Sequence, residues 1–223
     1  MILTSKESIA KHAQTEFQNL RGLDAFEAMA TGGFEEQAMQ QLFQQFALLS
    51  EAFPNDLLKL AARLKSEKAR TELMANLWDE QGQGDPANGH RAMLKRFLDA
   101  FIPKTQCGAE PSATWETRFF LNGTNGLYAN GTVAEALGAL FFVEMVTPWE
   151  FTQVANWLRQ NTTLSGSELQ FWNDHIEHDG LHALNLLEAS ADEALPLPEV
   201  LAGISQAKAL EDIFWGQFRR HVV

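Results

Sequence analysis

Residues 171–189, which read FWNDHIEHDGLHALNLLEA, predict the most informative helix of the chain. At about 100° of rotation per residue, a single narrow face of this helix gathers both apolar and polar side chains. The apolar members of that face are Phe171, Trp172, Leu186 and Ala189. Its polar members, His175, Asp179 and His182, therefore lie within the stripe that should face a core.

This polar group within an apolar stripe has two interpretations. Burying a carboxylate between two imidazoles is costly unless something compensates the charge. A divalent metal ion suits these three side chains best, because imidazole and carboxylate groups are its common ligands. A structural hydrogen-bond network between His and Asp is the alternative. This helix taken alone leaves both interpretations open.

Composition restricts the broad class of the protein. The 223 residues are 45% hydrophobic, which is ample for one core, and the formal net charge of −12 argues against nucleic acid and anionic membranes as partners. The only cysteine, Cys107, excludes an intrachain disulfide and fits a reducing compartment. The N-terminus has no apolar signal-peptide core, and the longest apolar run, residues 136–146, is too short to span a bilayer. We therefore expect a cytoplasmic protein.

Apolar periodicity predicts an all-α architecture of about seven to nine helices, because no segment shows convincing strand alternation. The predicted helices are residues 34–53, a helix that starts at Pro54, residues 66–80, a helix that begins at His90, residues 113–128, 132–146, 148–158, the helix of residues 171–189, and residues 200–221. We expect Ser66 to be the N-cap of the third of these. Residues 1–34 are interpreted as an N-terminal helical extension and residues 35–223 as the helical domain, within a single domain overall.

Three further predicted helices each place one ligand-type residue on an apolar face. These residues are Glu80, His90 and Glu144, whereas Asp79 points about 100° away from Glu80. With the three from residues 171–189, they make three carboxylates and three imidazoles, a set suited to Fe, Mn or Zn. His175 lies roughly 10 Å from His182 along the helix axis. Two ions about 3.5–4 Å apart accommodate both rings more easily than one ion does.

The order of these residues resembles that of a known superfamily. Glu80-x9-His90 within NLWDEQGQGDPANGH, then Glu144, then His175-x3-Asp179-x2-His182 resembles the heme-oxygenase-like diiron oxidases and oxygenases. The resemblance covers about residues 35–220 and extends to the CADD-like proteins. It implies the helical fold shared by heme oxygenase, TenA and PqqC proteins. It also implies a non-heme site for two iron ions, the second weakly held, with Glu80, His90, Glu144, His175, Asp179 and His182 as ligands and with Mn or Zn as substitutes.

Some members of that superfamily carry one more glutamate ligand. Glu72 is the nearest acid but points about 80° away from Glu80, and Glu51 lies near a predicted helix end, so neither is assigned. Two other functions stay open: a TenA-like thiamine-pyrimidine hydrolase that uses Cys107, and a metal-stabilised interaction module without catalysis. An ordinary heme oxygenase is disfavoured, because His12 is the only candidate proximal ligand and lies on no convincing apolar face.

The resemblance implies dioxygen and a small molecule as the partners of the site. We expect aromatic side chains to line the substrate pocket, among them Phe97, Phe119, Phe120, Phe141 and Trp172. Such a lining favours a small, partly apolar metabolite derived from a fatty acid or an amino acid. The assembly is left open between a monomer and a homodimer.

Overall fold

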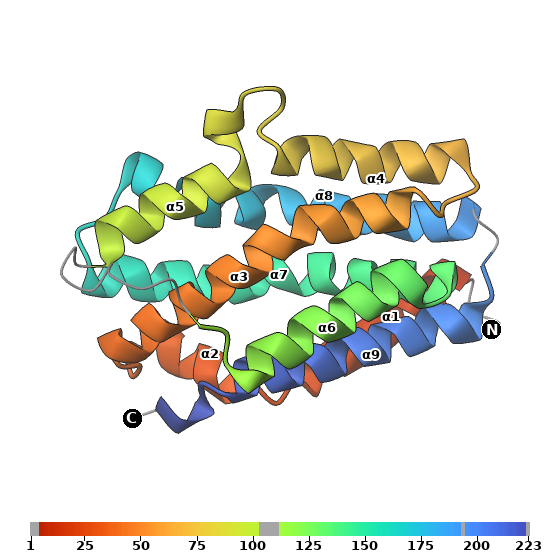
Figure 1. Cartoon of the computed structure of the whole chain (residues 1–223). Coiled ribbons are helices and arrows are strands. Elements are labelled where there is room, and N and C mark those ends of the chain that lie inside the picture. The colour runs from red at the N-terminus through yellow and green to blue at the C-terminus, as the bar shows by residue number, and fades with distance from the viewer. Residues whose placement is uncertain (1–4, 103–111, 193–194, 222–223) are drawn as a thin grey trace.

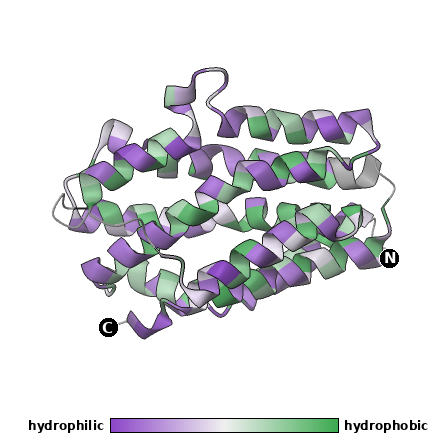
Figure 2. Cartoon of the chain, in the orientation of Figure 1, coloured by the Kyte–Doolittle hydropathy of each residue, from purple (hydrophilic) through white to green (hydrophobic). Residues whose placement is uncertain are grey.

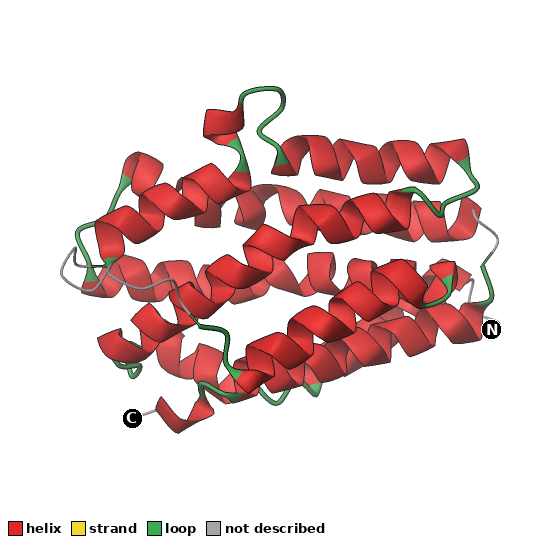
Figure 3. Ribbon diagram, in the orientation of Figure 1, coloured by secondary structure: helices red, strands yellow, loops and turns green. Residues whose placement is uncertain are grey.

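The computed structural model describes residues 5–102, 112–192 and 195–221 of the chain, apart from the side chains of residues 189–192. Within these ranges the chain forms α-helices, short 3-10 helices and no β-strand, so the predicted all-α architecture is confirmed (Figure 3). The α-helices are α1 (Ser5–Gln18), α2 (Leu23–Ala30), α3 (Glu36–Ala61), α4 (Glu67–Glu80), α5 (His90–Phe101), α6 (Trp115–Asn130), α7 (Val133–Asn161), α8 (Gln170–Asp192) and α9 (Leu197–Gly216). The 3-10 helices are η1 (Pro86–Asn88), η2 (Gly166–Glu168) and η3 (Arg219–His221).

Helix α7 is the central helix of the bundle. Its first half is apolar nearly all round, as the sequence predicts, and α8, α9, α2 and α6 pack against it (Figure 1). Its N-terminus is fixed by a capping box, in which the Thr132 side chain accepts from the backbone N–H of Glu135 and the Glu135 carboxylate accepts from that of Thr132. The Glu135 carboxylate is thus used in capping the helix, whereas the carboxylate of Glu144 is buried inside the bundle.

Two glycines set the close approach of α7 and α9. A Cβ atom on Gly138 would lie 2.1 Å from the carbonyl oxygen of Val200, and one on Gly203 would lie 2.0 Å from that of Glu135. Both contacts are with backbone atoms, which cannot move aside as a flexible side chain can. The two helices therefore pack backbone against backbone at this crossing.

Two prolines do not divide helices, contrary to the prediction. Helix α3 runs through Pro54 and α7 runs through Pro148, where the sequence predicted new helices to start. Proline lacks the N–H that would bond to the carbonyl four residues earlier, which is Glu144 in the case of Pro148. Packing on both sides of each proline keeps the helix continuous, because burial of the flanking apolar residues outweighs one lost hydrogen bond.

The remaining helices complete a bundle in which each apolar face is covered. Helix α1 packs against α9 and α2 packs against α7, so residues 5–30 contribute to the same core, for example through Ala13, Phe26 and Met29. Helix α4 lies beside α8, and α6 lies beside α9 (Figure 1). Most helices combine hydrophobic and hydrophilic residues, as amphipathic packing requires (Figure 2).

The N-terminus of α4 follows the predicted capping chemistry. The Ser66 hydroxyl accepts a hydrogen bond from the backbone N–H of Ala69, so the predicted N-cap is confirmed. None of the helices in the described ranges has the length and apolar character that crossing a bilayer would require.

Candidate metal centre

The candidate metal ligands are brought together by α4, α5, α7 and α8. Glu80 is the last residue of α4 and His90 is the first residue of α5. Glu144 lies near the middle of α7, and α8 supplies His175, Asp179 and His182. All six are buried or partly buried.

A tight connection between α4 and α5 places Glu80 beside His90. Gly82 has φ of +77°, and a Cβ there would lie 2.3 Å from the carbonyl oxygen of Asp85. Asp85 caps η1 by accepting from the backbone N–H of Ala87. The chain therefore turns back at once, and Nδ1 of His90 lies 2.9 Å from Oε1 of Glu80.

The six side chains form two groups of potential ligands. In the first group, formed by Glu80, His90 and His175, one ligand atom from each residue lies within 4.8 Å of the other two. In the second group, formed by Glu144, Asp179 and His182, the same limit is met. Both groups contain carboxylate and imidazole, which is the donor chemistry of Fe, Mn and Zn sites.

The protonation of His175 follows from its hydrogen bond. Its Nδ1 lies 2.7 Å from the carbonyl oxygen of Phe171, which can only accept, so Nδ1 carries the proton and donates. Burial and the nearby charge of His90 hold the pKa of His175 well below its usual value. The ring is therefore neutral, and its Nε2 keeps a lone pair that is available to a metal ion.

His182 is oriented by Asp79, which lies off the face of α4 that carries Glu80. Its Nε2 lies 3.1 Å from Oδ2 of Asp79, while its Nδ1 faces Oε2 of Glu144 and Oδ1 of Asp179, at 3.7 Å each. Asp79 lies off the face of α4 that carries Glu80, as predicted, but it still reaches the site because α8 packs along that side of α4. A carboxylate that accepts from the far nitrogen of a metal-binding histidine is a common outer-shell partner.

Glu144 is held by a second polar residue of α4. The side-chain amide of Asn76 donates to Oε1 of Glu144 over 2.7 Å, and both residues are only 3% exposed. Asn76 lies one turn before Glu80 on the same face of α4, but helical spacing does not predict its partner on another helix. Its hydrogen bond fixes one oxygen of Glu144 and leaves Oε2 directed toward His182.

The buried carboxylates of the site lie close together, and burial and the charges of neighbouring groups shift the pKa values of several residues. The pKa of Asp179 is raised well above its usual value, mainly by burial and to a smaller extent by the charges of Glu144 and Glu80. Burial lowers the pKa of His90, but the charge of Glu80 and the hydrogen bond that His90 donates to it outweigh this effect, so the pKa is raised overall. The pKa of His182 is raised in the same way, by Glu144 and Asp79 against burial. Divalent cations would relieve this crowding, so the residues fit a metal centre.

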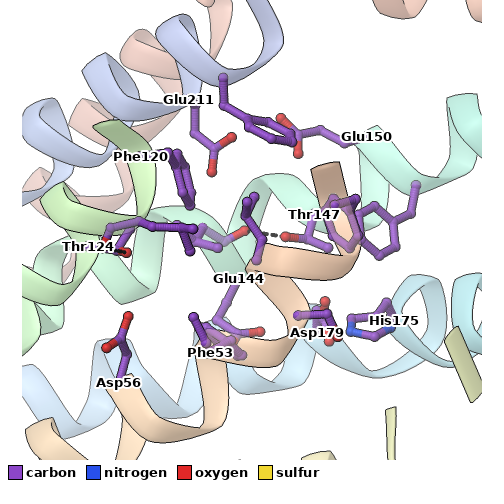
Figure 4. Close-up of a pocket in the computed structure, with 18 of the residues that line it drawn as sticks. Phe53, Asp56, Phe120, Thr124, Glu144, Thr147, Glu150, His175, Asp179 and Glu211 are labelled. Atoms are coloured by element: carbon purple, nitrogen blue, oxygen red, sulfur yellow. Dashed lines mark hydrogen bonds between the residues drawn. The ribbon is translucent and has the colours of Figure 1, made fainter. Parts of the chain in front are cut away.

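A mainly apolar cavity of about 100 Å³ borders the candidate ligands (Figure 4). Glu80, Glu144, His175 and Asp179 are among its lining residues. Its apolar lining comes from Phe46, Leu49, Phe53, Phe120, Leu121, Val143, Phe151, Phe171, Phe214 and Trp215. A second cavity, of about 260 Å³ and lined mostly by polar residues, borders His90 and His182. Four of the candidate ligands thus line the first cavity, and the other two line the second.

The predicted aromatic lining was mostly wrong. Of the five aromatic residues named from the sequence, only Phe120 lines the cavity beside the candidate ligands. Phe97 and Trp172 are fully buried in the core, and Phe119 is half exposed on α6. Periodicity identifies buried aromatic faces, but it does not distinguish a core position from a cavity wall.

The other residues considered from the sequence lie apart from the two groups. Glu51 pairs with Arg91 at the surface over 2.8 Å, and Glu72 belongs to neither group. Nε2 of His12 lies 2.9 Å from the hydroxyl of Ser205. Cys107 lies outside the described residues.

Solved structures with the same fold come from several bacteria and an archaeon. A CADD-like protein of unknown function from Nostoc punctiforme is 16% identical, with a TM-score of 0.80 and 98% of each chain covered. A TenA homolog from Pseudomonas syringae is 12% identical, with a TM-score of 0.79, and the match covers 98% of this chain and 96% of the homolog. A domain of unknown function with a heme oxygenase-like fold from Shewanella denitrificans is also 12% identical, with a TM-score of 0.74, covering 96% of this chain and 89% of that one.

Sequence comparison gives the family. No curated protein matches the chain. Residues 40–212 match the family described as "Iron-containing redox enzyme", and this range contains all six candidate ligands. The suspected superfamily is therefore confirmed: the chain has a heme-oxygenase-like fold and belongs to the family of iron-containing redox enzymes.

Proposed function

We propose that this protein is a non-heme dinuclear iron oxidase or oxygenase that activates dioxygen to oxidise a small metabolite. The observation that carries the proposal is the pair of three-residue groups beside one apolar cavity. Three carboxylates against two divalent ions leave a charge of about +1, which favours dioxygen, water or an anionic group as a further ligand. Membership of the iron-containing family favours iron, with Mn or Zn as substitutes.

In this proposal each group holds one ion. Glu80, His90 and His175 would bind the first, and Glu144, Asp179 and His182 the second. When bound, two ferrous ions would supply the two electrons that reduce dioxygen. Six side chains do not fill two octahedral coordination spheres, so positions would remain for dioxygen or water. Four of the six residues line the cavity.

The surrounding residues have separate tasks. The carbonyl of Phe171 holds the proton of His175 on Nδ1, and Asp79 holds that of His182 on Nε2, so each ring offers its other nitrogen to an ion. Asn76 fixes the orientation of Glu144. The aromatic wall of the cavity limits the access of water to the candidate ligands, which strengthens electrostatic interactions there.

Metal analysis and dioxygen uptake test the proposal. Protein loaded with Fe(II) without oxygen should retain about one to two iron ions per chain and should then consume dioxygen faster than free Fe(II) does. Asp179→Asn should retain less iron and consume dioxygen more slowly. Glu177→Gln, an exposed change on the same helix, should behave as the unchanged protein. Absence of bound iron under conditions that load a known diiron protein would refute the proposal.

A partner-binding role is the second candidate. Its supporting observation is a set of exposed large apolar side chains on the adjacent helices α4 and α8, namely Met74, Trp78, Leu181 and Leu184. Exposed apolar surface of this kind is typical of interaction sites when it is contiguous. Iron-loaded protein that does not react with dioxygen, but forms a homodimer that Trp78→Lys disrupts, would favour this role.

A further inference from the structure

The end of the apolar cavity beyond the candidate ligands carries two buried glutamates. Glu150 of α7 is 3% exposed and Glu211 of α9 is 5% exposed, and both line the cavity. Figure 4 shows their carboxylates converging at one end, with His175 and Asp179 at the other. Glu150 lies six positions after Glu144 in α7, which corresponds to roughly 9 Å along the helix axis.

Neither glutamate has a basic partner. In the part of the chain that the structure describes, no Lys, Arg or His side chain forms an ion pair with Glu150 or Glu211. Asp56, another acid that lines the cavity, is different, because its Oδ1 lies 2.8 Å from Nζ of Lys59. Oε1 of Glu150 is fully buried and has no hydrogen-bond partner. Such a buried acceptor is costly to leave unpaired.

Two threonine hydroxyls at the cavity donate to backbone carbonyls and not to the glutamates. Thr147 donates its hydroxyl proton to the carbonyl of Val143 over 2.8 Å, and Thr124 donates to the carbonyl of Leu121 over 3.2 Å. Both threonines therefore present only lone pairs to the cavity. The indole N–H of Trp215, which has no hydrogen bond of normal geometry, is a donor at this end.

We propose that Glu150 and Glu211 bind the ammonium group of a small amine, whose apolar part lies along the aromatic wall toward the candidate metal ligands. An ammonium group has three donors and no acceptor, which complements carboxylate and hydroxyl lone pairs. A third His, Cys, Asp or Glu ligand does not join the pair among the described residues, so an organic cation fits better than a metal ion. The net charge of −12 also favours a cationic ligand.

The protonation of the pair in the free protein agrees with this arrangement. Burial raises the pKa of Glu211 to about 8, although the Trp215 indole acts in the opposite direction. Burial and the charge of Glu211 raise the pKa of Glu150 well above its usual value. A bound ammonium would return both groups to their charged forms.

This inference deepens the proposed function, because it takes the cavity beside the candidate metal ligands as the substrate pocket. The test compares hexylammonium with hexanol and hexanoate, which share one apolar chain and differ in charge. Binding is measured by calorimetry and by the shift in melting temperature, with the metal-free and the Mn(II)-loaded protein. We expect hexylammonium to bind at least about tenfold more tightly than either control ligand.

Isosteric variants locate the effect. Glu150→Gln and Glu211→Gln should each weaken hexylammonium binding by about tenfold or more and leave hexanol binding unchanged. Glu177→Gln, on the exposed side of α8, should bind all three ligands as the unchanged protein does. Equal binding of the three ligands, preference for hexanoate, or an unchanged preference in both cavity variants would overturn the inference. The last result would mean that the two glutamates only share a proton.

The two proposals fail in different ways. Protein that binds iron and consumes dioxygen but shows no preference for hexylammonium refutes the amine pocket alone. Protein that prefers hexylammonium but binds no iron refutes the dinuclear site alone and leaves an amine-binding pocket.

Discussion

Replacing Asp79 by Asn tests how the second group of ligands is organised. Asp79 accepts from Nε2 of His182 over 3.1 Å, which leaves Nδ1 facing Glu144 and Asp179. An asparagine has the same shape but is neutral and carries its own N–H donors, so it holds this tautomer less firmly. Loss of such an outer-shell partner typically weakens metal affinity by about 10–100-fold.

The loss of metal affinity predicts a change in the melting temperature of the metal-loaded protein. A 10–100-fold loss corresponds to about 1.4–2.7 kcal/mol of metal-linked stabilisation at saturating metal. In a chain of this length each kcal/mol shifts the melting temperature by about 2–4 °C. The rise in melting temperature caused by excess Mn(II) should therefore be roughly 3–11 °C smaller in Asp79→Asn than in the unchanged protein.

The control for this measurement lies on the same helix. Glu72→Gln removes one negative charge from α4 at a residue that belongs to neither ligand group. It should show the full rise with Mn(II), which is measured by calorimetry over a range of metal concentrations. If Asp79→Asn also shows the full rise while Asp179→Asn does not, Asp79 does not orient His182, and the assignment of its tautomer is wrong.

Three further predictions use other parts of the structure. The raised pKa of Glu211, about 8, means that its contribution to the stability of the metal-free protein is present below its unfolded pKa and is lost as pH rises toward 8. Glu211→Gln should therefore flatten the fall in melting temperature between about pH 6 and 8.5, and an unchanged slope would contradict this. Asp179→Asn should raise the melting temperature of the metal-free protein, because burial and the charges of Glu144 and Glu80 disfavour the charged form of Asp179. The same change should reduce the rise in melting temperature caused by Mn(II). A lower melting temperature without metal would contradict this. In urea unfolding, Gly138→Ala should destabilise the protein by about 1–3 kcal/mol, because its Cβ would meet the carbonyl of Val200. A Cβ on Gly126 meets no atom within 4 Å, so Gly126→Ala should be neutral or stabilising. Equal effects would contradict the packing of α7 on α9.

The cavity glutamates Glu150 and Glu211 could be predicted only in part from the sequence. Glu211 lies between Leu210 and Phe214 in the last helix, so an acid within an apolar stripe was visible there, as it was for Glu144. Its spacing predicts burial but does not indicate that it lines a cavity. Glu150 follows Pro148, and the prediction of a new helix at this proline separated it from Glu144. The continuous α7 places both residues on one cavity.

Helical periodicity predicts neither the contact that Asp79 makes with another helix nor the continuity of α3 and α7 at their prolines. A helical wheel gives the direction of a side chain from its own axis, but not which other helix lies in that direction. Asp79 lies off the buried stripe of α4 and still reaches His182, because α8 passes on that side. A proline weakens a helix locally, but whether the helix continues depends on how its flanking residues are packed.

The sequence by itself determined that the chain is all-α, which face of most helices is buried, and which six ligand-type residues lie on those faces. These features follow from spacing along one helix, which is a local property of the chain. Only the tertiary structure decided that the six residues divide into two groups of three, that Asp79 and Asn76 hold His182 and Glu144, and that Glu150 meets Glu211 across the cavity. Each of these is a contact between different helices, and it is set by how closely and at what positions those helices pack.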